Sequence, residues 1–389
     1  MTNTLDKLIC AVCAALCLLV SGVANAEFLS SIDRRLLVAS EFGITAEVKA
    51  MLEAGARIDA RNEDGYTPLI RATNFGHQEV VETLVAAGAD INARSQDVQA
   101  TPLTVACYQG NIEVVRLLLD HGADVRARNI VGDDCLMHAV AQGHLEISAL
   151  ALERGGEISG VNTRGLTPLH RAAFYGGLAV VRLLLNKGAS KDVRNNDGKT
   201  PLFRAAENGH VRVVELLASL GAKLDTRDQA DRTPLIAAVA LNQRRVIDAL
   251  LRLGADASAR DKAGRTILFH AVSKGEAILA DKLIDHGLPV NGVDRAGTTP
   301  IMVAAEEGKW NVAVTLLAKG ADVGAVDTEG RDALMIAAQN GRTNFTRQLL
   351  ARGADPSRRD RNGKNALAYA LDKAYIYTGE LLAGHLQKK

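Results

Sequence analysis

The sequence repeats itself every 33 residues, and this period restricts the folds that the chain can adopt. A leucine or isoleucine recurs at one phase of the period, and every step is 33 residues except the 34 between Leu69 and Leu103. A glycine recurs at a second phase, from Gly55 to Gly353. Such a period is typical of a solenoid, in which each unit buries its apolar side only against its neighbours. The leucine phase is occupied by Leu36, Leu69, Leu103, Leu136, Leu169, Leu202, Leu235, Leu268, Ile301, Leu334 and Leu367.

Each period carries the signals of two short helices and a turn, and residues 166–198 are the clearest copy. Pro168 suits the first turn of a helix, where no backbone donor is needed. Gly176 suits the left-handed residue that follows a helix. The run 180–185 then has apolar residues at helical spacing, and Asp197-Gly198 is a hairpin-turn signal. A unit this short cannot bury its own apolar side, so the units must stack.

The first helix of this copy begins Thr167-Pro168-Leu169-His170-Arg171-Ala172, which resembles the T-P-L-H-x-A motif of ankyrin repeats. The resemblance covers residues 31–389 in about eleven units. It implies an all-α fold, a curved and elongated ankyrin-repeat solenoid of stacked helix-turn-helix units with β-hairpin-like loops. The units begin near residues 34, 67, 101, 134, 167, 200, 233, 266, 299, 332 and 365.

Residues 1–26 lie outside the repeats and have the pattern of a secretory signal peptide. Lys7 precedes an apolar run over residues 8–20, and Ala24-Asn25-Ala26 fits a cleavage site. We therefore expect a signal peptide over 1–26 and a single repeat domain over 27–389. The exported chain is expected in the periplasm, without stable membrane insertion after cleavage. A secreted protein and a chain anchored by an uncleaved signal are the alternatives.

Two cysteines, Cys107 and Cys135, remain outside the signal peptide. Neighbouring helices pack roughly 8–10 Å apart, and five residues of axial offset add roughly 7 Å. Their Cα atoms should then lie beyond the ~7 Å reach of a disulfide. The spacing predicts two unpaired, buried thiols. An export signal without disulfides would favour a bacterial periplasm over a eukaryotic secretory route.

No catalytic motif and no set of metal ligands stands out in the sequence. His77, His144 and His210 share a phase but lie two repeats apart, roughly 20 Å at the spacing of packed helices. We interpret them as structural residues of the turn between the two helices. We expect no enzyme, no cofactor and no metal site. The net charge of +1 gives no reason to expect a nucleic-acid partner.

The resemblance also implies where another protein would bind. In ankyrin proteins the concave groove is formed by the hairpin tips and by the exposed ends of the first helices. Those positions carry aromatic residues in the N-terminal half of this chain and basic residues in the C-terminal half. The alternatives are rings that tilt into the seams between repeats and basic residues that are only solvated tips. The predicted partner-binding residues are Phe42, Tyr66, Phe75, Tyr108, Phe174, Tyr175, Leu241, Arg232 and Arg265.

The expected function is that of a non-enzymatic, monomeric scaffold that binds another protein in this groove. Similarity to bacterial ankyrin proteins with signal peptides suggests that it guards, stabilises or inhibits an enzyme or toxin in the periplasm. A secreted effector that docks a host protein and a glycan-binding module are the alternatives. In the last unit, Tyr375 and Tyr377 are interpreted as packing at the end of the stack rather than as a binding site.

Overall fold

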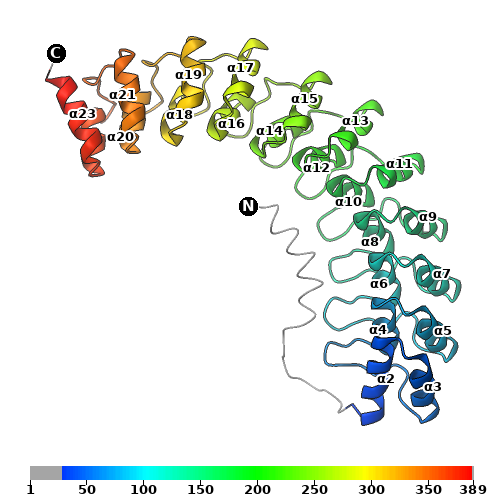
Figure 1. Cartoon of the computed structure of the whole chain (residues 1–389). Helices are drawn as coiled ribbons and strands as arrows, with labels where there is room; N and C mark the ends of the chain where they lie inside the picture. The colour runs from blue at the N-terminus through cyan, green and yellow to red at the C-terminus, as the bar shows by residue number, and fades with distance from the viewer. Residues whose placement is uncertain (1–28, 388–389) are drawn as a thin grey trace. The chain divides into compact units, whose positions relative to one another are not determined.

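A computed structural model describes residues 29–387, and all regular secondary structure within that range is helical (Figure 1). Each repeat contributes a first helix, a short turn, a second helix and an extended loop that leads to the next repeat. This arrangement confirms the all-α repeat fold that the 33-residue period predicts. The predicted signal peptide, residues 1–26, lies outside the described residues.

The contacts along the chain divide it into two units, unit 1 up to residue 201 and unit 2 from residue 202, and each is described by itself. The single domain expected over 27–389 stays a prediction. Unit 1 contains α2 (Ser31–Phe42), α3 (Thr45–Glu53), α4 (Pro68–Asn74), α5 (Gln78–Ala86), α6 (Pro102–Gln109), α7 (Ile112–Asp120), α8 (Cys135–Gln142), α9 (Leu145–Glu153), α10 (Pro168–Tyr175) and α11 (Leu178–Asn186).

The repeats of unit 2 have the same pairing of helices. After α12 (Pro201–Glu207), which begins at the boundary, unit 2 contains α13 (Val211–Ser219), α14 (Pro234–Ala240), α15 (Arg244–Arg252), α16 (Ile267–Lys274), α17 (Ala277–Asp285), α18 (Pro300–Glu307), α19 (Trp310–Ala318), α20 (Ala333–Gln339), α21 (Thr343–Ala351), α22 (Ala366–Asp372) and α23 (Ile376–Leu386).

Local chemistry sets the ends of the first helices. Before α6, the Thr101 hydroxyl accepts the Thr104 amide at 3.2 Å, and the Thr104 hydroxyl accepts the Thr101 amide at 2.8 Å. These two bonds form a capping box that satisfies donors which the helix itself leaves unpaired. After α10, Gly176 has φ of 79°, the left-handed conformation that glycine adopts without steric cost.

The core of each unit lies between successive first helices, which contact one another in chain order. The leucine phase occupies this core, and its ten residues from Leu36 to Leu334 are at most 1 % exposed. Apolar burial of this kind contributes roughly 25 cal/mol for each Å² removed from water. Each first helix packs on its neighbouring first helices and on the second helix of its own repeat, so stacking of the repeats contributes much of the stability.

Some repeats place other residues where glycine usually stands. Asp231 and Asn242 take φ of 57° and 56° at the two positions where other repeats have glycine. Short polar side chains tolerate this region. Ala374 also has φ of 56°, after α22 in the last repeat, but its methyl group can form no compensating hydrogen bond. The last repeat therefore carries backbone strain.

The side chains that end the last repeat are more exposed than expected. Tyr377 is 80 % exposed and Tyr375 is 39 % exposed. The interpretation of both tyrosines as packing at the end of the stack is therefore wrong for Tyr377. It holds only in part for Tyr375, whose ring approaches Gly341 of the preceding repeat.

The two cysteines form a disulfide, so the prediction of unpaired thiols is wrong. Their Cα atoms are 5.3 Å apart, and both side chains are fully buried. The prediction used the separation of helix axes, whereas facing Cα atoms stand about 2.3 Å out from each axis and are closer by about twice that. The short distance also leaves no room for the expected axial offset, so α6 and α8 are not aligned residue for residue. The expected absence of disulfides therefore no longer favours a bacterial periplasm over a eukaryotic secretory route.

Replacing both cysteines, Cys107→Ala with Cys135→Ala, is expected to lower the free energy of unfolding by about 3.5 kcal/mol. The bond joins residues 28 apart in sequence, and closing a loop of this length removes about that much entropy from the unfolded chain. Urea denaturation followed by circular dichroism measures the change. The wild-type chain unfolded in reductant is the control and should lose the same amount. A double variant as stable as the oxidised wild type would contradict a stabilising bond.

Ala374→Gly is expected to raise the free energy of unfolding by about 1 kcal/mol, because glycine adopts positive φ without the clash of a Cβ atom. Asn242→Gly serves as the matched comparison, and a smaller gain is expected there because asparagine already tolerates this conformation. Thermal denaturation of the two variants measures both. A larger gain at Asn242 than at Ala374 would be inconsistent with this reasoning.

Candidate protein-binding surfaces

Three of the aromatic residues that were predicted to bind a partner protein are exposed at the ends of first helices in unit 1. Phe42 ends α2, Phe75 follows α4, and Tyr175 ends α10, with exposed fractions of 67 %, 48 % and 37 %. The first helices α2, α4, α6, α8 and α10 contact one another in that order, so their ends follow one side of unit 1 (Figure 1). We call Phe42, Phe75, Tyr108, Phe174 and Tyr175 the aromatic row.

The ring of Phe75 is held by a basic residue one helical turn earlier. The Arg71 guanidinium lies 5.7 Å from the ring centroid, within the range of a cation–π contact. Arg71 also forms an ion pair with Glu41 of the preceding repeat. On its other side, Phe75 stacks on His77 with centroids 6.3 Å apart. The ring is therefore positioned before any partner arrives.

Tyr175 has the same support from Arg171, whose guanidinium lies 5.9 Å from the ring centroid. Arg171 donates to Asp133 Oδ2 at 2.7 Å, and both side chains are nearly buried, with 8 % and 4 % exposed. The half-buried ring of Phe174 packs edge-on against Tyr175 with centroids 4.8 Å apart. A buried ion pair thus fixes this end of the aromatic row.

The remaining tyrosines of unit 1 are less accessible. Tyr108 is half-buried and meets His138 edge-on at 5.8 Å. Tyr66 is only 9 % exposed, packs with Ile70, and donates its hydroxyl to Asp97 Oδ2 at 2.7 Å. The exposure predicted for Tyr66 is therefore corrected, because its ring lies in the seam beside the hairpin loop. For Tyr66 the alternative interpretation is correct: its ring lies in the seam between repeats and is not exposed in a groove.

The predicted residues of unit 2 do not form a comparable surface. Leu241 follows α14 and is 45 % exposed. Arg232 Nη2 lies 2.7 Å from Asp228 Oδ2, and Arg265 Nη2 lies 3.2 Å from Asp261 Oδ2. These acids also accept backbone amides of their own hairpins. Each predicted arginine is thus largely neutralised by an acid four residues earlier.

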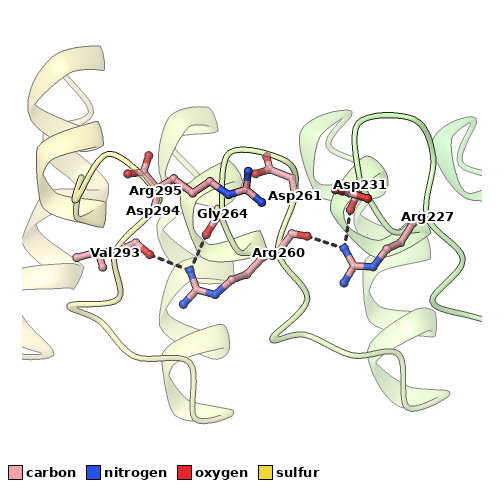
Figure 2. A pocket seen from close by; sticks show the side chains of 8 residues that line it. All are labelled: Arg227, Asp231, Arg260, Asp261, Gly264, Val293, Asp294 and Arg295. Carbon is pink, nitrogen blue, oxygen red and sulfur yellow. Dashed lines mark hydrogen bonds between the residues drawn. The ribbon is translucent and has the colours of Figure 1, made fainter. Parts of the chain in front are cut away.

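The hairpins of unit 2 enclose a shallow pocket of about 420 Å³ (Figure 2). Arg260 Nη1 donates to the carbonyls of Gly264 and Val293, at 2.5 and 2.8 Å, and so ties its own hairpin to the next one. Arg227 makes the same pair of bonds one repeat earlier, as the dashed lines in Figure 2 show. These guanidinium groups act first as links between hairpins. The lining residues are Arg227, Asp231, Arg260, Asp261, Gly264, Val293, Asp294 and Arg295.

Sequence reasoning did not identify the basic side chains of unit 2 that form no ion pair within residues 29–387. Lys262, Arg295 and Arg361 are exposed at the hairpin tips, and none has an ion-pair partner within residues 29–387. Each follows directly after the hairpin aspartate. Their position directly after the aspartate could have distinguished these unpaired cations from Arg232 and Arg265, which stand four residues after an aspartate and pair with it.

A buried polar cluster between the repeats of unit 1 is the closest approach to a catalytic arrangement. Asp134 Oδ1 accepts the Met137 amide at 2.9 Å at the start of α8, and burial raises the pKa of Asp134 to about 6. Burial lowers the pKa of His138 to about 4, and Asn129 lies 3.2 Å from its Nε2. Asp134 is fully buried, so substrate cannot reach it. We interpret the cluster as structural.

His77 and His144, two of the three histidines interpreted as structural residues of the turn, contact the preceding repeat there. His77 Nε2 lies 2.8 Å from the Glu41 carbonyl oxygen, and His144 Nε2 lies 3.2 Å from that of Tyr108. Each histidine thus contacts the preceding repeat. Within residues 29–387, no group of three or more His, Cys, Asp or Glu side chains could hold a metal ion. In the same range no helix is both long and apolar enough to cross a membrane.

Comparison with known proteins agrees with the repeat pattern. A family model for ankyrin repeats in three copies matches overlapping segments along almost the whole chain. No curated protein matches the chain significantly. The matched segments are 14–95, 36–129, 103–195, 136–228, 190–261, 235–327 and 311–388.

Asp134 and His138 are expected to affect stability with opposite pH dependence. Folding raises the Asp134 pKa to about 6, so the folded state binds a proton that the unfolded state lacks; its contribution is full below pH ~4 and is lost as pH rises to about 6. Folding lowers the His138 pKa to about 4, so its contribution is full above pH ~6.5 and is lost as pH falls to about 4.

Relative to wild type, Asp134→Asn should therefore become more stable as pH rises from 4 to 7, by on the order of 2–3 kcal/mol. His138→Val should become more stable relative to wild type as pH falls from 7 to 4, by a similar order. Urea denaturation at several pH values measures both differences. Parallel pH slopes for the two variants would contradict the assignment.

Proposed function

Because the chain belongs to the ankyrin-repeat family, whose repeats are protein-binding modules, we propose that it is a non-enzymatic scaffold and that the aromatic row of unit 1 binds a partner protein. The observation that supports this proposal most strongly is the exposure of Phe42, Phe75 and Tyr175. Exposing an aromatic ring to water costs free energy, so folding of the chain alone would favour burying these rings. Aromatic side chains of this kind are typical anchors of protein interfaces.

The support beneath the rings favours binding over chance exposure. Arg71 and Arg171 hold Phe75 and Tyr175 through cation–π contacts and are themselves fixed by ion pairs. Side chains that are already ordered lose less conformational entropy when a partner binds. Arg232 and Arg265 have a smaller part in this proposal, because their charge is largely satisfied within their own hairpins.

We further propose that the protein is exported and acts in the periplasm. The buried Cys107–Cys135 disulfide supports export, because such bonds persist in oxidising compartments, of which the periplasm is one. The composition of residues 1–26 supports it independently. In that compartment a scaffold without catalytic groups would guard, stabilise or inhibit an enzyme or a toxin.

The decisive experiment compares partners captured by crosslinking from the periplasm with wild type and with Phe75→Ala/Tyr175→Ala. The double variant should recover at least tenfold less partner, because each interface anchor typically contributes more than about 1 kcal/mol. Leu220→Ala is the matched control, since Leu220 is 51 % exposed and lies in unit 2. Circular dichroism should show unchanged helix content in all three proteins.

Equal recovery by wild type and the double variant would reject the aromatic row as the binding surface. Binding of purified cell-wall fragments that the same double variant abolishes would favour the glycan-binding alternative. Turnover of a substrate by the purified chain alone would refute a non-enzymatic scaffold.

A further inference from the structure

One hairpin of unit 1 has apolar residues at its tip, where every other hairpin has polar residues or alanine. Ile130 is 62 % exposed and Val131 is 43 % exposed. In the hairpins from 62–66 to 360–364, the same two phases otherwise hold only charged residues, uncharged polar residues or alanine. Exposing branched apolar side chains to water costs free energy, so folding of the chain alone does not account for them. We call residues 129–133 the apolar hairpin.

Hydrogen bonds within the apolar hairpin and to both neighbouring hairpins fix its tip. The Asn129 side-chain oxygen accepts the Val131 amide at 3.1 Å. The Ile130 amide donates to the Val98 carbonyl of the preceding hairpin at 2.9 Å, and the Val131 carbonyl accepts the Thr163 amide of the following hairpin at 3.0 Å. A partner that binds the two apolar side chains therefore has little backbone left to order, which lowers the entropy cost of binding.

The first residue of the apolar hairpin is connected to the aromatic row through one histidine. Asn129 Nδ2 lies 3.2 Å from His138 Nε2. The His138 ring meets the ring of Tyr108 edge-on, with centroids 5.8 Å apart. In unit 1 the hairpin loops lie on the side of the first helices that is opposite the second helices (Figure 1). One side chain therefore separates this end of the hairpin from a ring of the aromatic row.

The last residue of the apolar hairpin is connected to the aromatic row through one arginine. Asp133 Oδ2 accepts Arg171 Nη1 at 2.7 Å, and the Arg171 guanidinium lies 5.9 Å from the centroid of the Tyr175 ring. Asp133 Oδ1 accepts Asn162 Nδ2 at 2.9 Å, so the carboxylate is held from both sides. The apolar hairpin and the rings of Tyr108 and Tyr175 thus belong to one connected surface.

Acidic side chains lie on the α2 side of the apolar hairpin. Glu63 is exposed and Asp64 is half-buried at the tip of the hairpin two repeats earlier, and neither forms an ion pair within residues 29–387. Arg61 and Arg94, at the bases of these earlier hairpins, donate to backbone carbonyl oxygens instead. Two repeats at the spacing of packed helices place the acids roughly 20 Å from the apolar tip.

We propose that the apolar hairpin is a second wall of the partner site and that the site binds a segment of a partner protein with apolar and basic side chains. The apolar side chains of the segment contact Ile130, Val131 and the rings of the aromatic row. Its basic side chains pair with Glu63 and Asp64, roughly six residues away, because six residues of extended chain span roughly 20 Å. This inference rests on the proposed function, since the aromatic row is the first wall of the site.

A phage-displayed library of random 16-residue peptides, selected on the immobilised full chain, supplies the probe. Fluorescence anisotropy then measures the affinity of each selected peptide for wild type and variants. Ile130→Gln/Val131→Ala should bind these peptides at least tenfold more weakly, because two apolar anchors are lost. This variant gives the tip the residues that a later hairpin carries as Gln229-Ala230, so the hairpin should still form. Val326→Ala is the matched control, since Val326 is 46 % exposed but lies in unit 2, and its affinity should equal that of wild type.

The selected sequences and a charge variant test the basic part of the segment. Selected peptides should carry Lys or Arg roughly six residues from an apolar residue, the separation derived from the spacing of the repeats. Glu63→Gln/Asp64→Asn should bind these peptides at least threefold more weakly, because the charges that pair with the basic residues are removed while the side-chain shapes are kept.

The outcomes separate this inference from the proposed function. Peptides that bind Phe75→Ala/Tyr175→Ala weakly but Ile130→Gln/Val131→Ala normally would overturn the second wall and leave the aromatic row as the binding surface. Peptides that bind both variants as tightly as wild type would reject the second wall and the aromatic row together. Selected peptides without Lys or Arg, or a library that yields no binding peptide, would overturn the proposed chemistry of the segment.

Discussion

The contact between the first helices of successive repeats is the interaction on which the rest of the structure depends. A unit of 33 residues is too short to bury its apolar side alone, and the leucine phase is buried where neighbouring first helices pack on it. The same contact sets the order of the helix ends, and with it the aromatic row. Within residues 29–387 the first helix of the last repeat, α22, packs on α20, and its Leu371 is 62 % exposed.

Many charged residues in this protein form contacts within and between the repeats and are therefore not free to bind a partner. Arginines such as Arg260 donate to carbonyl groups of two hairpins, and hairpin aspartates such as Asp261 accept backbone amides while pairing with a cation four residues later. Asp294 departs from this pattern because Thr298 stands where the cation would be. In unit 1, Arg171 combines a buried ion pair with a contact to an exposed ring. A row of basic residues is therefore a weak guide to binding in such a fold.

Much of the fold could be predicted from sequence, because the signals are local. Threonine caps, first-turn prolines and left-handed glycines fix the helix ends, and the same logic accounts for the conformations of Asp231 and Asn242. The disulfide could not be predicted, since it depends on how far α6 and α8 are displaced along each other, here by roughly the 7 Å that separates the two cysteine positions along the helix. The burial of Tyr66 depends on Asp97 one repeat later. The pairing of Arg232 with Asp228 could have been predicted, because a spacing of four residues brings an acid and a base together in these hairpins.

The disulfide gives the array a fixed point between its third and fourth repeats. Linear arrays fray from their ends, since a terminal repeat has only one neighbour to hold it. Opening that starts at α2 can pass through two repeats freely, but then meets a covalent bond between adjacent layers. Tyr108 directly follows Cys107, whereas Phe42 and Phe75 lie on the side that can still open. Hydrogen exchange would therefore divide the aromatic row into a labile segment and a protected one.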